Sequence, residues 1–282
     1  MTAAATEGTH EVPHEVPHDV PTDAFVPSGS IVRRIWNDAD LVLLVFAGAA
    51  AEFALNREAD WLFVTGALPA DPLGRLFSTA AVAQAIVSGT RDRAERALAR
   101  IRTAHAAVER RRGARIPDWA HRDVLYLLVD YSERAFAALH RPLTLAERAE
   151  LWALFRRVGA GLAIPELPAD YPSWRVDRER HLMRDLAVSA HTGALYAAYR
   201  RALGPWRYVL LRQVQGALAP ERVRALLGLP RRPWAASLLP LYPALARRGL
   251  GPLVRRLLVP PTHLAAVQRL DRPATAPSAE PW

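Results

Sequence analysis

The sequence predicts an all-α fold: a single globular helical domain of about eight to ten helices, given typical helix lengths. Apolar residues recur at helical spacing in several stretches, and helix-capping residues precede many of them. No strand pattern and none of the usual nucleotide-binding, zinc-hydrolase or serine-hydrolase motifs occurs, so those chemistries lack support. We expect the helical domain at residues 29–270, between disordered tails at 1–28 and 271–282.

The composition limits the chemistry further. The 282 residues are 51% hydrophobic, which is enough for a substantial core, and they include no cysteine. Disulfides, cysteine-ligated zinc, iron–sulfur clusters and thiolate haem ligation are therefore excluded, and any haem iron needs a histidine or another non-thiolate ligand. All 37 basic residues are arginine and the net charge is +9, but acidic residues lie among them. This scatter favours a solvated surface over a nucleic-acid site.

The two ends of the chain differ in character. The N-terminal segment repeats HEVPHEVPHDVP, in which His10, His14 and His18 recur every four residues. The prolines between them prevent a helix from aligning these side chains, so we expect loose metal binding at most. No apolar signal segment follows the start, which favours a cytoplasmic protein. The C-terminal third combines RRPW, ARRG and VRRLL with apolar runs, so peripheral contact with an anionic membrane surface stays open.

The first helical stretch, residues 30–55, contains the 15-residue run LVLLVFAGAAAEFAL. This run is shorter than the ~20 residues that a helix needs to span a bilayer, so it predicts a buried core helix. Gly48 and the alanines after it would let another helix or a flat cofactor come close. Because an unpaired buried carboxylate is costly, we expect Glu52 to pair with an arginine.

A loop follows, with the sequence NREADWLFVTGALPA over residues 56–70. Loops on a helical scaffold often carry function, and Glu58 and Trp61 could reach a pocket from here. The alternative is that Trp61 and Phe63 simply pack against the core.

The next helix begins at DPLGRLFST. Asp71 is placed to cap it, Pro72 occupies its first position, and Gly89 marks its end. Arg75 and Thr79 are four residues apart, so a guanidinium and a hydroxyl point from one helical face.

A second helix follows, capped by Ser88 or Thr90 and ending at Gly113. His105 lies on its apolar stripe and therefore faces inward. Such a histidine can be a hydrogen-bonded core residue or an axial ligand of haem iron, and spacing does not choose between them. His121, in the first turn of the next helix, is a second candidate ligand. We expect it to be neutral, because an imidazolium there would oppose the helix dipole.

The rest of the domain is also helical. Asp118 is expected to cap the helix that carries His121, and the capping box that begins at Thr144 starts another helix, which ends near residue 160. A long helix is expected over residues 173–203, with His181 and His191 nearly opposite on its wheel. Short helices separated by prolines follow residue 205.

Three blocks in order, DPLGRLFST, SGTRDRAERALARIRTAHAAV and RPLTLAERAELWALFRRVG, resemble the catalytic domain shared by the MpaB oxygenase and the latex clearing protein, or rubber oxygenase. The resemblance covers roughly residues 30–230. It implies an all-helical fold that holds a b-type haem, with a proximal histidine, an arginine and a threonine on the distal side, and a carboxylate base.

Carried over by position, the resemblance places Arg75 and Thr79 on the distal side and makes His105 the proximal iron ligand, with Arg75 also near a haem propionate. Glu58 stands near the expected base, but Asn56-Arg57 replaces the His-Pro of many members. The motif itself therefore leaves the base unassigned.

The function that the resemblance implies is that of a haem b-dependent oxygenase. Its substrates would be O₂ and an apolar small molecule or polyisoprenoid, in oxidative C=C cleavage or in the oxidative tailoring of secondary metabolism. Two other functions stay open: a non-enzymatic helical module that binds lipid or a membrane surface, and a haem carrier or sensor.

Overall fold

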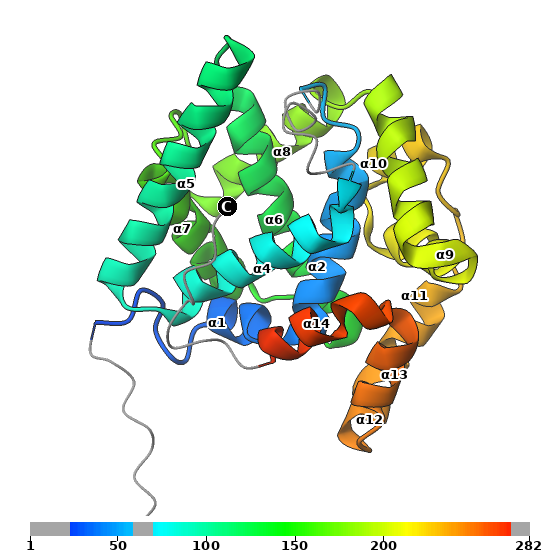
Figure 1. Cartoon of the computed structure of the whole chain (residues 1–282). Helices are drawn as coiled ribbons and strands as arrows, with labels where there is room; N and C mark the ends of the chain where they lie inside the picture. The colour runs from blue at the N-terminus through cyan, green and yellow to red at the C-terminus, as the bar shows by residue number, and fades with distance from the viewer. Residues whose placement is uncertain (1–22, 59–69, 272–282) are drawn as a thin grey trace, which may run out of the picture.

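The computed structural model describes residues 23–58 and 70–271, and within these ranges the chain is all-α (Figure 1). No strand occurs in the described part; two isolated β-bridges join Ala24 to Thr90 and Asn56 to Leu186. The predicted fold class is confirmed. His10, His14 and His18 and the loop residues Trp61 and Phe63 lie outside the described residues. The expected tails are described only at residues 23–28 and at Asp271, and in the first of these Phe25 and Val26 are buried in the core.

The α-helices are α1 (Ile31–Trp36), α2 (Ala39–Phe53), α4 (Pro72–Ser88), α5 (Arg91–Arg112), α6 (Asp118–Leu139), α7 (Leu145–Gly161), α8 (Tyr171–Arg184), α9 (Ala190–Leu218), α10 (Glu221–Leu227), α11 (Ala235–Leu238), α12 (Tyr242–Arg247), α13 (Gly251–Leu258) and α14 (Leu264–Leu270). Two short 3₁₀ helices, η2 (Leu239–Leu241) and η3 (Pro261–His263), link the last of them. Short helices separated by prolines follow α9, as the sequence predicts, although they begin after Leu218 and not at residue 205, because α9 continues past Pro205.

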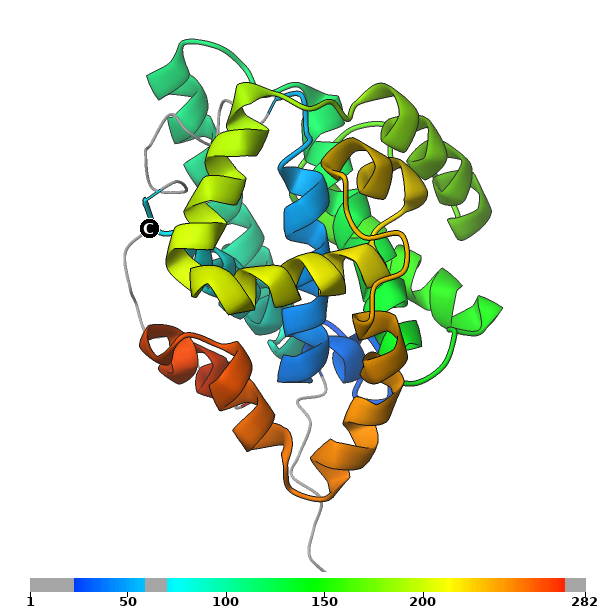
Figure 2. The same ribbon diagram turned by 90° about the vertical axis from the view of Figure 1, so that its right-hand side faces the viewer.

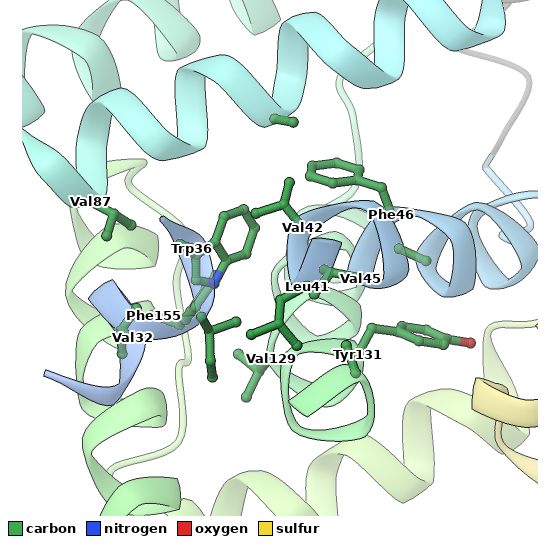
Figure 3. Packing of buried hydrophobic residues seen from close by; sticks show 14 of the residues in the cluster. Val32, Trp36, Leu41, Val42, Val45, Phe46, Val87, Val129, Tyr131 and Phe155 are labelled. Carbon is green, nitrogen blue, oxygen red and sulfur yellow. The ribbon is translucent and has the colours of Figure 1, made fainter. Parts of the chain in front are cut away.

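Helix α2 runs through the middle of the molecule (Figure 2) and contacts α1, α4, α6 and α9. Its apolar residues pack with those of α1, α4, α6 and α7 in the core shown in Figure 3. Phe46 and Trp36 meet there edge to face, with ring centroids 6.1 Å apart. Gly48 lets α6 approach, because a Cβ at this position would lie 2.3 Å from Cδ1 of Tyr131. A neighbouring helix, and not a cofactor, therefore lies against Gly48.

The apolar stretch 30–55 forms two helices because a cap interrupts it. The Asp38 carboxylate accepts hydrogen bonds from the backbone N–H groups of Asp40 and Leu41, over 2.9 and 3.1 Å, and so starts α2. Among the described residues, no helix is long and apolar enough to cross a membrane.

The prediction of a single helix over residues 173–203 is wrong. Helix α8 ends at Arg184, and Ser189 caps α9 in a reciprocal box with Thr192. Between them the chain pairs with the end of α2, where the N–H of Ala187 donates to the carbonyl of Leu55 over 2.8 Å. His181 and His191 consequently lie on separate helices, α8 and α9.

Helix α9 itself bends at Gly204, which has φ 73° and ψ 172° and precedes Pro205 (Figure 2). Glycine tolerates this positive φ, and the following proline disfavours a helical residue before it. The other predicted helix caps are confirmed with one exception. Asp71 caps α4, Thr90 caps α5 and the Thr144 box caps α7, but Pro117 is the N-cap of α6 and Asp118 is its first residue.

Candidate active site

Five helices, α2, α4, α5, α6 and α9, line a cavity of about 340 Å³. Most of the wall is apolar; it includes Phe46, Phe53, Leu76, Ile101, Leu127 and Leu128. Among the described residues that line it, the polar side chains are Arg75, Thr79, His105 and Tyr199. Three residues singled out from the sequence therefore lie around one cavity, and Tyr199 joins them from a helix to which sequence reasoning gave no functional role.

Helix α4 brings Arg75 and Thr79 to the cavity from its N-terminal half. The helix starts where it does because the Asp71 carboxylate accepts from the N–H of Gly74 over 2.8 Å. The Thr79 hydroxyl donates to the carbonyl of Arg75 over 2.8 Å, so its proton is used within the helix and its oxygen lone pairs remain as acceptors. Both residues are exposed, which places them at the mouth of the cavity.

His105 faces the cavity from α5, with apolar neighbours on the same wall. Burial and then the nearby His121 lower the pKa of His105 to about 4, against the attraction of Glu109. The imidazole is therefore neutral at physiological pH, the state in which a histidine nitrogen can bind a metal.

His121 lies directly beside His105, with ring centroids 4.9 Å apart and planes inclined by 33°. Burial lowers its pKa as well, while Glu109 and Asp118 oppose the shift, so the expectation of a neutral His121 agrees with the structure. His121 does not belong to the described lining of the cavity. The two candidate ligands are thus neighbours, and His105 is the one that lines the cavity.

Glu58 lies elsewhere. Its carboxylate is 3.5 Å from the Arg112 guanidinium, and its backbone N–H donates to the side chain of Asn56 over 2.9 Å. Arg112 is seven residues, or two turns, beyond His105 along α5. Glu58 is not among the described residues that line the cavity, so the geometry does not join it to Arg75 and Thr79.

A buried ionic cluster lies behind the cavity wall. Arg178 of α8 donates to both carboxylate oxygens of Glu52, over 2.5 and 2.6 Å, and also to Asp130 of α6, over 3.0 Å. Burial opposes the charge of Arg178, but Glu52 and Asp130 outweigh it and raise its pKa. The expected arginine partner of Glu52 is therefore confirmed. Sequence reasoning missed Arg178 and Asp130 themselves.

Asp123 completes this cluster. Its Oδ2 accepts from the Asn56 amide over 2.6 Å, while its Oδ1 has no hydrogen-bond partner among the described residues and lies 3.7 Å from Arg178. Burial and then the charge of Glu52 raise the pKa of Asp123 to about 7, against Arg178 and Asn56. Asp123 and Glu52 each precede a lining residue, Val124 and Phe53, so the cluster fixes two walls of the cavity.

The fold and the cavity together define a class: an all-helical protein with an apolar pocket that carries one neutral imidazole and one guanidinium on different walls. A family model described as "ER-bound oxygenase mpaB/B'/Rubber oxygenase, catalytic domain" matches residues 33–268. The chain belongs to this family, and the resemblance noted in the sequence is confirmed. No curated protein and no solved structure matched the chain.

The polar side chains around the cavity match the requirements of a haem and not those of a bare metal ion. In the described part of the chain, no group of three or more histidine, cysteine or acidic side chains is arranged to hold a metal ion. A haem does not need such a group, since the porphyrin supplies four nitrogens and the protein one axial ligand. The neutral His105 suits that ligand, the apolar walls suit the macrocycle, and Arg75 suits a propionate. The residues present therefore fit a haem.

Proposed function

We propose that this chain is a haem b-dependent oxygenase that acts on an apolar substrate, a small molecule or a polyisoprenoid. Membership of the oxygenase family supports the reaction class. The observation that carries the proposal is the arrangement of His105, Arg75 and Thr79 around one apolar cavity, although the three come from two helices and lie up to 30 residues apart.

In this proposal His105 holds the haem iron through a neutral imidazole nitrogen. When bound, haem iron supplies the redox chemistry that activates O₂. His121, beside His105, is a positioning residue that fixes the orientation of the ligand ring and, because it is also neutral, adds no positive charge there.

Arg75 and Thr79 act at the mouth of the cavity. The Arg75 guanidinium holds an anionic group, such as a haem propionate, by charge-assisted hydrogen bonds. The Thr79 hydroxyl donates its hydrogen bond to the Arg75 carbonyl, so toward the cavity it offers a hydrogen-bond acceptor. It becomes a donor to the cavity only when the hydroxyl rotates.

The apolar walls select the substrate. Phenyl and aliphatic side chains bind a hydrocarbon chain and exclude water, while the few polar groups fix its position. Glu58 is the candidate base by its place in the sequence. Because its carboxylate pairs with Arg112, it would have to exchange that partner to take up a proton from a substrate.

The test is haem uptake followed by O₂ consumption. The purified chain, with added haemin, should show a Soret band that shifts on reduction by dithionite, and should then consume O₂ with squalene as an apolar alkene. Cleavage of a C=C bond places both oxygen atoms of O₂ in two carbonyl products and needs no reductant. Monooxygenation inserts one atom, releases the other as water and needs two electrons from a reductant.

These requirements separate the outcomes. After one reduction of the haemin-loaded chain, squalene cleavage under ¹⁸O₂ with label in both carbonyl products and no further reductant consumed would identify the cleavage reaction. One labelled oxygen in the product and two electrons consumed per turnover would identify monooxygenation. A Soret band without O₂ consumption on any apolar substrate would indicate a carrier or sensor. A colourless chain that takes up no haemin would contradict the proposal.

A further inference from the structure

Helices α12 and α13 form a hairpin that extends beyond the other helices at one end of the molecule (Figures 1 and 2). We call residues 238–258 the leucine hairpin. The first arm runs from the end of α11 through η2 and α12, and the second is α13 with the residue before it. Each arm exposes leucines at positions i, i+3 and i+7. These are Leu238, Leu241 and Leu245 on the first arm and Leu250, Leu253 and Leu257 on the second. Leu253 and Leu257 are 65% and 60% exposed.

The charged residues within this part of the chain are all basic. Residues 231–270 contain seven arginines and no aspartate or glutamate. Arg255 is neutralised within the molecule, because it pairs with Asp40 over 2.8 Å and also with Asp271. Arg247, Arg248 and Arg256 are exposed and form no ion pair with residues that the structure describes. The hairpin therefore presents uncompensated positive charge beside its leucines.

The arrangement of side chains on α13 is typical of a helix that lies in the interface between a membrane and water. At 100° per residue, Leu250, Leu253 and Leu257 fall within one third of the wheel, and Arg256 lies at its edge. Arginine stems can pack along an apolar layer while the guanidinium reaches the phosphates above it. An apolar face bordered by arginine is complementary to an anionic lipid surface, in which both parts find partners.

A second cavity opens at the base of the hairpin. It measures about 200 Å³, and its wall is mainly apolar, although Asp40, Arg207 and Arg255 also line it. The hairpin contributes Leu239, Tyr242 and Leu258 to this wall. It shares Ala50, Leu76 and Tyr199 with the His105 cavity, so the two adjoin. An apolar cavity continuous with the hairpin suits lipid contact better than contact with a polar protein surface.

We infer that the leucine hairpin docks on an anionic lipid surface, with its leucines in the acyl boundary and Arg247, Arg248 and Arg256 at the phosphates. This goes beyond the proposed function, because the exposed leucines do not line the His105 cavity and docking needs no haem.

The test is co-flotation of the full chain with vesicles. One set contains phosphatidylcholine with 30% phosphatidylglycerol, and the other contains phosphatidylcholine alone. The wild type should float with the anionic vesicles and much less with the neutral ones. Leu253→Asp/Leu257→Asp and, separately, Arg247→Glu/Arg248→Glu should each lower partitioning about tenfold or more, from lost acyl contact and lost phosphate attraction.

Matched controls lie far from the hairpin in sequence. Leu145→Asp removes a leucine that is 78% exposed, and Arg156→Glu removes an exposed arginine. Both should float as the wild type does, and circular dichroism should show that every variant folds. No flotation of the wild type with anionic vesicles, or equal flotation of hairpin and control variants, would overturn the inference. A dimer in size-exclusion chromatography that only the hairpin variants dissociate would also overturn it, because a second copy would then cover this face.

Discussion

Arg178 on α8 donates to both carboxylate oxygens of Glu52 on α2, and both side chains are fully buried. The pair joins residues 126 positions apart and, through Asp130, holds α2 and α6 together. Since these helices form two walls of the cavity, the proposed chemistry depends on a salt bridge that takes no part in it.

Loss of this arginine should be severe. Arg178→Met leaves Glu52 buried without its partner and leaves Asp130 with Arg134 as its hydrogen-bonded arginine. We expect a loss of about 3–5 kcal/mol in the free energy of unfolding, measured by urea denaturation. Arg180→Met removes an exposed arginine from the same helix, so it should cost about 1 kcal/mol or less. The double variant Glu52→Gln/Arg178→Met should recover part of the loss. Equal stabilities for the two single variants would contradict this role.

Asp123 predicts a pH dependence of stability. Its pKa is about 7 in the folded chain against the ordinary aspartate value of 3.8, so the folded state binds the proton more tightly than the unfolded state. The stability that this group contributes is therefore fully present below pH 3.8 and is lost as the pH rises to about 7. Asp123→Asn removes the titration and keeps an acceptor for Asn56. The difference in unfolding free energy between wild type and variant should change across this interval, and a constant difference would be inconsistent with the raised pKa.

Gly48 should resist substitution because α6 packs directly on it. A Cβ would lie 2.3 Å from the Tyr131 ring, so we expect Gly48→Ala to lower the unfolding free energy by about 1–3 kcal/mol. Gly193, in α9, has no atom within 4 Å of such a Cβ, and Gly193→Ala should be neutral or stabilising. Thermal denaturation measures the difference in stability between the two variants. Equal stabilities would indicate that α2 and α6 pack less closely than the structure shows.

Thr79 and Ser78 provide a matched pair. Both hydroxyls donate to the Arg75 carbonyl, over 2.8 and 2.9 Å, but of the two only Thr79 is among the described residues that line the cavity. Thr79→Val should lower substrate-dependent O₂ consumption about tenfold, the equivalent of one hydrogen bond, while the Soret band keeps its intensity. Ser78→Ala should leave the rate unchanged. Similar losses in both would indicate a structural effect on α4 alone.

Glu58 can be tested in the same assay. Glu58→Gln keeps the shape of the side chain and removes its basicity, so we expect a lower kcat with unchanged haem content if the carboxylate is the base. Arg112→Met removes its ion-pair partner but leaves the carboxylate, and should retain or raise the rate. An unchanged kcat in Glu58→Gln would exclude this residue as the base.

Much of the fold follows from local signals. The caps at Asp71, Thr90 and Thr144 act within four residues of their partners, so the sequence alone predicts where α4, α5 and α7 begin. The break between α8 and α9 was not predicted, because it also depends on the remote backbone pairing of Ala187 with Leu55. The helical spacing of apolar residues continues across this break, so the sequence pattern does not reveal it.

The residues of the candidate site also fall into a group that local sequence signals predict and a group that they do not. Helical spacing places Arg75 beside Thr79 and turns His105 inward, and the family resemblance connects the two helices. Tyr199 and the cluster of Arg178, Asp130 and Asp123 were missed, because their roles depend on which helices become neighbours. The arginine partner of Glu52 could be expected only as a residue type, from the cost of a buried charge.

The central claim is that His105 holds the haem iron, and the most direct measurement is the absorption spectrum of His105→Ala beside that of His121→Ala, each with added haemin. The two imidazoles lie 4.9 Å apart between ring centroids and both have lowered pKa values, so they form a matched pair. We predict that the Soret band collapses in His105→Ala and persists in His121→Ala with a small shift. A full and unshifted band in His105→Ala would contradict the assignment.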